Sequence, residues 1–293
     1  MNTTSVLNQL DDQIEQALAT GHEDSLPILG YGEINPVLQW SGANGPIAVK
    51  RLPIFDSAIR LEKYRNQFDE FVTTLRNRGI EVIESRLEVI KRVDGNQVVY
   101  CIQPALARAV LLPEVIRYAD HAKRIEIFSL LSDALISAIS PQLGLDAQVS
   151  NWGLADGKLT YLDVTTPMLR DASEKDRLDT DLFVASFPAI SRSFIRNFLL
   201  RRILNPYFSS RTAALDLIGN LHKERLGFAI PLAVEIFNDR LTTDLSIDEV
   251  RHNYRREARL WGFGQWIRRC DRTWQRRVRR RSYPFLLPGR VPR

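Results

Sequence analysis

The spacing of apolar and polar positions changes character along the chain. Between residues 27 and 104 the apolar residues come in short runs, broken by turn signals such as SGANGP (41–46) and VDGN (93–96). This pattern is typical of strands joined by hairpins. Residues 56–78 interrupt it with apolar positions every three or four residues, which indicates a helix. Beyond about residue 105, helical spacing dominates.

The expected helix over 56–78 carries its own start and stop signals. Asp56 or Ser57 can cap its first turn, and Gly79 can end it. The apolar stripe expected to face the core consists of Ile59, Tyr64, Phe68, Phe71 and Leu75.

The remaining elements follow from the same rules. They are a helix over 5–19, three strands between 27 and 50, strands over 80–92 and 97–104, a helix over 121–139, a hairpin of strands 151–155 and 158–164, and helices over 177–186, 188–203, 210–222, 228–240 and 246–281. This order predicts an α+β protein with a strand-rich first part and a mostly helical second part.

Several polar and glycine residues stand at the ends of these elements. The turn LGYGEI holds Gly30 and Gly32, and Lys50 ends the third strand in IAVKR. Asp146 and Asn151 lie five residues apart between the long helix and the hairpin, and Asp163 ends that hairpin. Each motif alone is weak evidence, but their order along the chain is specific.

In this order the motifs resemble those of the protein-kinase-like superfamily, and its aminoglycoside and choline phosphotransferase branch more than its protein kinases. The resemblance covers residues 27–185. It implies a bilobal protein-kinase-like α+β fold, with an antiparallel-sheet N-lobe and a mostly helical C-lobe. The superfamily commonly has a His two residues before the catalytic Asp, where this chain has Gly144, and the Asp-Phe-Gly triplet is Asp163-Val164-Thr165 here. These departures argue against a eukaryotic-type protein kinase and leave room for a degenerate or non-canonical enzyme.

The resemblance also implies roles and cofactors, ATP and Mg²⁺. Lys50 would bind the α- and β-phosphates, and Asp146 would accept the proton of the incoming hydroxyl. Asn151 and Asp163 would hold the metal, because Mg²⁺ prefers hard oxygen ligands and few protein groups. The nucleotide-covering turn would comprise Gly30, Tyr31, Gly32, Glu33 and Ile34.

Two further assignments follow from the resemblance. Lys50 is expected to pair with an acid on the helix over 56–78, and Glu62, Asp69 and Glu70 all remain candidates. Gln103 and Ala105 fall at the expected hinge between the lobes, where backbone groups would bind adenine.

Charge is unevenly distributed. The net charge is +5, but residues 268–293 contain ten Arg and one Asp, so the rest of the chain is close to −4. The main body is therefore not expected to be a basic nucleic-acid binder. The Arg-rich segment can be a solvated helix surface, an anchor for anionic lipid or nucleic acid, or a site for an acidic partner.

These features give a domain plan and a location. The plan has an N-terminal helical extension (1–25), an N-lobe (26–105), a helical C-lobe with the catalytic loop (106–267) and an Arg-rich tail (268–293). The first residues lack the layout of a secretion signal, and no apolar run reaches the roughly 18 residues of a spanning helix. Cytoplasm is the expected location.

The expected function is an ATP- and Mg²⁺-dependent phosphotransferase that acts on a hydroxyl of a small molecule. Two alternatives remain open. One is a protein kinase, or an enzyme that moves another nucleotide-derived group onto protein. The other is a kinase-shaped binding module without turnover, in which the basic tail carries the function.

Overall fold

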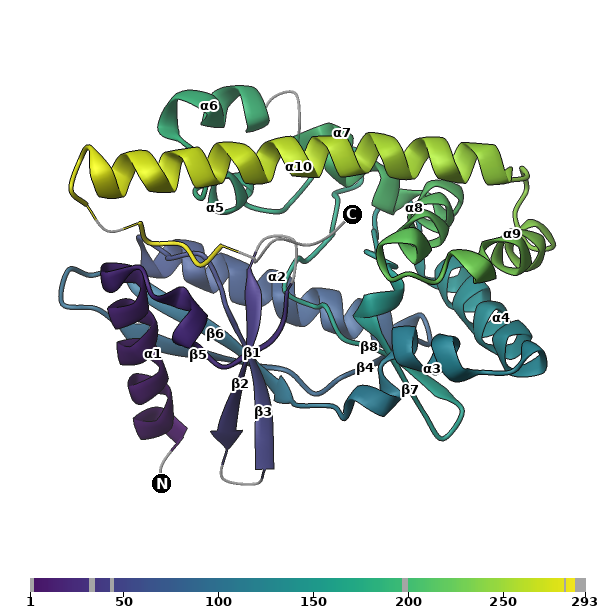
Figure 1. Cartoon of the computed structure of the whole chain (residues 1–293), viewed down its shortest axis with the longest axis horizontal. Helices are drawn as coiled ribbons and strands as arrows, with labels where there is room; N and C mark the ends of the chain where they lie inside the picture. The colour runs from purple at the N-terminus through teal and green to yellow at the C-terminus, as the bar shows by residue number, and fades with distance from the viewer. Residues whose placement is uncertain (1–2, 32–34, 43–44, 197–199, 282, 288–293) are drawn as a thin grey trace.

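The computed structural model shows an α+β protein, as expected from the sequence, and it describes residues 3–31, 35–42, 45–196, 200–281 and 283–287. Its larger sheet has five antiparallel strands in the order β1-β2-β3-β6-β5 (Figure 1). The strands are β1 (Ile28–Tyr31), β2 (Pro36–Gly42), β3 (Gly45–Arg51), β5 (Arg86–Lys91) and β6 (Gln97–Pro104). Strand β6 therefore lies inside the sheet.

Strand β6 is buried on both faces, and its side chains alternate between two cores. Val98, Tyr100 and Ile102 pack with α1 (Thr3–Thr20), while Val99 and Cys101 join the larger core that contains α2 (Ala58–Asn77). This period of two is the geometry of a strand covered on each side. The two helices thus sandwich the sheet, and the position of a residue along β3 or β6 decides which core it faces.

The start and end of α2 agree with the sequence signals. The Ser57 side chain accepts a hydrogen bond from the Arg60 amide at 3.3 Å, and Gly79 adopts φ +82° at the end. Tyr64 is buried, as are Phe68, Phe71 and Leu75, but Ile59 is 83% exposed. The expectation that Ile59 faces the core is wrong, because α2 begins only at Ala58 and its first turn precedes the buried stripe.

A second, smaller sheet links the first part of the chain to the helical part. It consists of β4 (Glu81–Val82), β8 (Lys158–Tyr161) and β7 (Trp152–Ala155), in the order β4-β8-β7. Strand β4 pairs with β8 in parallel, Val82 opposite Tyr161. The hairpin that precedes Asp163 is therefore fixed directly to the segment that follows α2.

Helices dominate the second part of the chain. They are α3 (Leu112–Tyr118), α4 (His121–Ala138), α5 (Thr180–Val184), α6 (Ala189–Phe194), α7 (Leu200–Leu204), α8 (Ser210–Lys223), α9 (Ile230–Asn238) and α10 (Ile247–Arg277). The 3-10 helices are η1 (Glu23–Ser25), η2 (Arg108–Val110), η3 (Val149–Asn151), η5 (Asn205–Phe208) and η6 (Gly227–Ala229). The sequence pattern predicted helix at each of these places except α3, but it gave 188–203 as a single helix where the described residues form α6 and α7. None of the described helices is long and apolar enough to cross a membrane.

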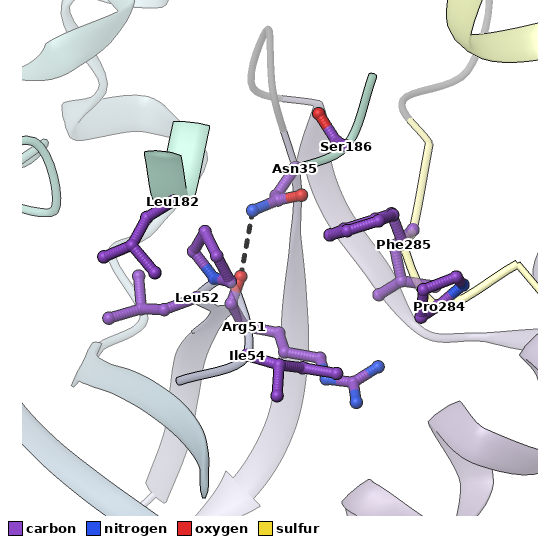
Figure 2. Close-up of a pocket in the computed structure, with 10 residues that line it drawn as sticks. Asn35, Arg51, Leu52, Ile54, Leu182, Ser186, Pro284 and Phe285 are labelled. Carbon is purple, nitrogen blue, oxygen red and sulfur yellow. Dashed lines mark hydrogen bonds between the residues drawn. The ribbon is translucent and has the colours of Figure 1, made fainter. Parts of the chain in front are cut away.

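The C-terminal residues return to the first sheet. Helix α10 runs along one long edge of the molecule, and the chain beyond it crosses back toward α1 and β1 (Figure 1). Leu286 joins the core beneath α1, and the Tyr283 hydroxyl donates to the Ser186 carbonyl at 2.7 Å. Figure 2 shows the small cavity at this junction. Its lining includes Asn35, Arg51, Leu52, Leu182, Pro284 and Phe285.

Candidate functional site

A lysine and an aspartate from distant parts of the chain meet beside the large sheet. The Lys50 ammonium lies 2.9 Å from Oδ1 of Asp163, and both side chains are mostly buried. Lys50 belongs to β3, and Asp163 follows β8. The contact therefore joins the five-stranded sheet to the helical part of the molecule.

Local structure explains how Lys50 comes to this place. Lys50 lies opposite Cys101 in the β3–β6 ladder, and opposite residues in an antiparallel pair project from the same face. Cys101 is buried in the core that contains α2. Burial raises the pKa of the Cys101 thiol to about 12, while the charges of Lys50 and Asp163 act on it in opposite directions. Cys101 therefore remains a neutral, apolar neighbour of the charged pair.

Asp163 is held by the residues around it. Its Oδ1 accepts hydrogen bonds from the Thr165 hydroxyl at 2.8 Å and the Thr165 amide at 3.3 Å, besides the one from Lys50. Burial by itself raises the pKa of the Asp163 carboxyl. The positive charge of Lys50, with the hydrogen bonds from Lys50 and Thr165, outweighs burial and leaves the pKa below its ordinary value of 3.8. Asp163 is therefore an anion at neutral pH.

Asp146 and Asn151 lie in one tightly bonded loop that ends in η3. The Asn151 side-chain amide donates to the Asp146 carbonyl at 3.1 Å, and the Tyr161 hydroxyl donates to the same oxygen at 3.2 Å. The Asn151 carbonyl also accepts from the Leu162 amide at 2.9 Å, one residue before Asp163. The loop is thereby joined to the segment that presents Asp163, so the expected group of Asp146, Asn151 and Asp163 is brought together by backbone contacts.

Packing explains one departure from the kinase pattern. A Cβ atom added at Gly144 would lie 3.1 Å from the Met168 Cβ and from the Phe208 ring. A histidine at this position would collide with the core, so the loop requires a small residue here.

Two oxygen atoms of this group are suited to a metal. Within the described part of the chain, Asp163 Oδ2 and Asn151 Oδ1 accept no hydrogen bond. Carboxylate and amide oxygens are hard ligands of the kind that Mg²⁺ binds, and Mg²⁺ keeps several waters or substrate oxygens besides. No cluster of three or more His, Cys, Asp and Glu side chains that could hold a metal occurs among the described residues. Two such oxygens are too few to complete the coordination of Mg²⁺ by themselves.

The expected partner of Lys50 is corrected. Lys50 contacts Asp163. Among the described contacts, none of the three expected acids, Glu62, Asp69 and Glu70, pairs with it. Glu70 instead binds the Arg177 guanidinium through both carboxylate oxygens, at 2.5 and 2.7 Å, and Glu62 is exposed. The helical spacing placed both acids on one face of α2, but that face is directed to solvent and to the segment before α5.

Tyr64 takes the place on α2 that sequence reasoning assigned to an acid. Its hydroxyl donates to the Thr165 carbonyl at 3.0 Å. This bond fixes Thr165 to α2, and the Thr165 hydroxyl in turn donates to Asp163. Burial raises the pKa of Tyr64, and the negative charge of Asp163 acts in the same direction. The sequence placed Tyr64 in the apolar stripe, and only the hydroxyl distinguishes it from the core residues around it.

The remaining candidates fall in three places. The Gln103 side chain donates to the Leu162 carbonyl at 2.8 Å and to Ser85 at 2.9 Å. The Ala105 amide donates to the Pro46 carbonyl at 3.1 Å, so this amide is already engaged. Gly30 lies in β1 opposite Val37.

Tyr31 ends β1 opposite Pro36. Gly32, Glu33 and Ile34 lie outside the described residues. Of the turn expected to cover a nucleotide, only Gly30 and Tyr31 belong to the described residues, and both lie in β1.

Fold and site together define an α+β protein in which a sheet lysine meets an aspartate presented by a hairpin of the helical part. Residues 9–272 match a family described as "Family of unknown function (DUF6206)", and the chain belongs to this family. No curated protein matches the chain.

Proposed function

We propose that this protein has a bilobal protein-kinase-like fold and transfers a phosphoryl group from ATP to a hydroxyl of a small molecule, with Mg²⁺. The proposal rests on the contact between Lys50 and Asp163. The two residues lie 113 positions apart in the chain, and the resemblance had assigned them to the phosphates and the metal of one site. The sheet order β1-β2-β3-β6-β5, with α2 between β3 and β5, supports it.

Each residue has a task in this reaction. Lys50, a compact positive charge, binds the α- and β-phosphates. Asn151 Oδ1 and Asp163 Oδ2 would hold Mg²⁺, which supplies positive charge to the phosphates. Asp146 accepts the proton of the acceptor hydroxyl. The hydroxyl oxygen forms a bond to the γ-phosphorus, and the bond between that phosphorus and the β–γ bridging oxygen breaks. ADP is the leaving group, and the products are ADP and a phosphate monoester.

The resting pair has a role in this scheme. With no nucleotide bound, the Lys50 ammonium neutralises Asp163, so neither charge is buried alone. On binding, the ATP phosphates would take the place of Asp163 beside Lys50, and Mg²⁺ would take the place of Lys50 beside Asp163. Binding of ATP and of Mg²⁺ is therefore expected to be mutually reinforcing.

Two variants test the assignment. Asp163→Asn is expected to abolish the increase in melting temperature that ATP gives with Mg²⁺, because a ligand that binds only the folded state raises it by mass action. Asp146→Asn is expected to keep this increase and to lose ATP turnover by about 100-fold or more. Asp12→Asn, an exposed acid on α1, is the matched control and should behave as the parent.

The outcomes separate the possibilities. An Asp163→Asn variant that folds, as judged by circular dichroism, and still responds to ATP with Mg²⁺ would contradict the metal assignment. Phosphate that appears on protein, and not on a small molecule, would favour the protein-directed alternative.

One observation favours a second candidate, a nucleotide-binding module without turnover. The residue of α2 beside the pair is Tyr64, a neutral donor, where the resemblance implies an acid that holds the lysine. A parent protein that is stabilised by ATP, and forms no ADP with any hydroxyl acceptor or water, would support this candidate over the enzyme.

A further inference from the structure

A stripe of large apolar side chains is exposed along α10. Phe263, Trp266, Trp274 and Val278 are each 56–60% exposed, and Cys270 between them is exposed as well. Successive members lie three or four residues apart, so they share one face over roughly 22 Å of helix. The rings of Phe263 and Trp266 are stacked, with centroids 6.0 Å apart. Apolar side chains gathered in this way on one exposed face indicate an interaction surface.

Arginines flank the apolar stripe at both ends. Exposed arginines before it are Arg255, Arg256 and Arg259, and those around its last member, Val278, are Arg277, Arg279, Arg280 and Arg281. No Asp or Glu of the described chain is exposed between residues 249 and 281. The surface is therefore apolar in the middle and positively charged at each end.

The opposite side of α10 is already occupied. Val250, Asn253, Gly264 and Arg268 are buried against the rest of the molecule. In Figure 1, α10 crosses the upper part of the molecule, with α6 drawn above it. Arg272 and Arg276 are directed to Glu23. The helix thus has one face for folding and a second face that folding does not use.

We propose that this second face of α10 binds the surface of a lipid bilayer that contains anionic headgroups. Aromatic side chains lie favourably at the boundary between headgroups and acyl chains, and arginines at either end bind the phosphates while their stems contact apolar groups. Each arginine near an anionic surface strengthens binding by about fivefold. The helix would lie in the plane of the interface.

The arrangement favours lipid over nucleic acid. A single-stranded nucleic acid requires positive charge along its whole path, next to each stacked base. Here the central part holds Cys270 between the aromatic rings, and the exposed arginines gather at the two ends.

The test uses the full chain and vesicles of phosphatidylcholine, with or without a minority of phosphatidylglycerol, in a flotation assay. The parent is expected to float with the anionic vesicles only, and its tryptophan emission is expected to move to shorter wavelength. Trp266→Ser with Trp274→Ser should weaken binding by roughly tenfold or more, because two apolar rings are lost from the interface. Tyr118→Ser, an exposed aromatic on α3, is the matched control and should leave binding unchanged.

A second pair of variants tests the charges. Arg277→Gln, Arg280→Gln and Arg281→Gln together should weaken binding by roughly tenfold to 100-fold. Lys91→Gln, Lys158→Gln and Lys175→Gln remove the same charge from exposed positions elsewhere and should change it little. The proposal is overturned if the parent ignores vesicles, if neutral vesicles bind equally well, or if both triple variants lose the same affinity. It is also overturned if an RNA oligonucleotide binds while vesicles do not.

Discussion

A short chain of hydrogen bonds determines where Asp163 lies. Tyr64 donates to the Thr165 carbonyl, and the Thr165 hydroxyl donates to Asp163. Tyr64→Phe keeps the ring in its core position and leaves the buried Thr165 carbonyl without this donor. We expect the free energy of unfolding to fall by about 1–2 kcal/mol, measured by urea denaturation. Tyr118→Phe at an 82% exposed position should change it by less than about 0.5 kcal/mol. Equal stability of Tyr64→Phe and the parent would show that the hydroxyl contributes nothing.

The Asp163 carboxyl also predicts a dependence on pH. Its pKa in the folded protein lies below the ordinary value of 3.8, so its ionised form stabilises the fold above that value. This stabilisation is lost as the pH falls through the lowered pKa. Asp163→Asn has no such group, so the difference in unfolding free energy between parent and variant should shrink between pH 6 and pH 3. Urea denaturation at each pH measures it, and a difference that is constant with pH would contradict the ionic role of Asp163.

Elements were predicted well where local rules decide them. The caps of α2, the hairpin turns and the periodic helices follow from residues close together in the sequence, and the structure has them close to the expected places. The strand expected over 80–92 is wrong, because the chain there forms two strands, β4 and β5, that pair in different sheets. Helix α3 was missed because its seven residues start at the LLP run, directly after a 3-10 turn, and are too short to show a period.

The order of motifs along the chain also predicted that Lys50 and Asp163 would belong together. The partner of Lys50 could not be derived in the same way. The apolar stripe gave the inward face of α2, with Tyr64 on it, but not which groups of distant segments would meet the helix. Only the folded chain shows that Tyr64 reaches the Thr165 carbonyl and that Glu70 binds Arg177.

At the scale of the whole molecule, the end of the chain is fixed to its beginning. Glu23 in η1 accepts hydrogen bonds from Arg272 at 3.0 and 3.2 Å and from Arg276 at 2.8 Å. Arg276 also donates to the Leu18 carbonyl at the end of α1, at 3.1 Å. These contacts hold the basic end of α10 against the sheet side of the molecule, and they keep two arginines away from the exposed stripe. The position of the proposed membrane face therefore depends on one carboxylate.

Glu23→Gln tests this dependence. The variant keeps the shape of the side chain and leaves Arg272 and Arg276 close together without their shared negative partner. We expect the free energy of unfolding to fall by about 1–2 kcal/mol. This value lies between those of exposed and buried ion pairs, because the side chains of Glu23, Arg272 and Arg276 are partly buried. Glu126→Gln is the matched control, because its pair with Lys123 is exposed and lies within one helix, so its loss should stay below about 0.5 kcal/mol. Faster cleavage by trypsin within residues 269–281 should accompany the change at Glu23 and not the control. If both variants unfold alike and are cut alike, the end of α10 is held by its apolar contacts, and Glu23 has no part in orienting it.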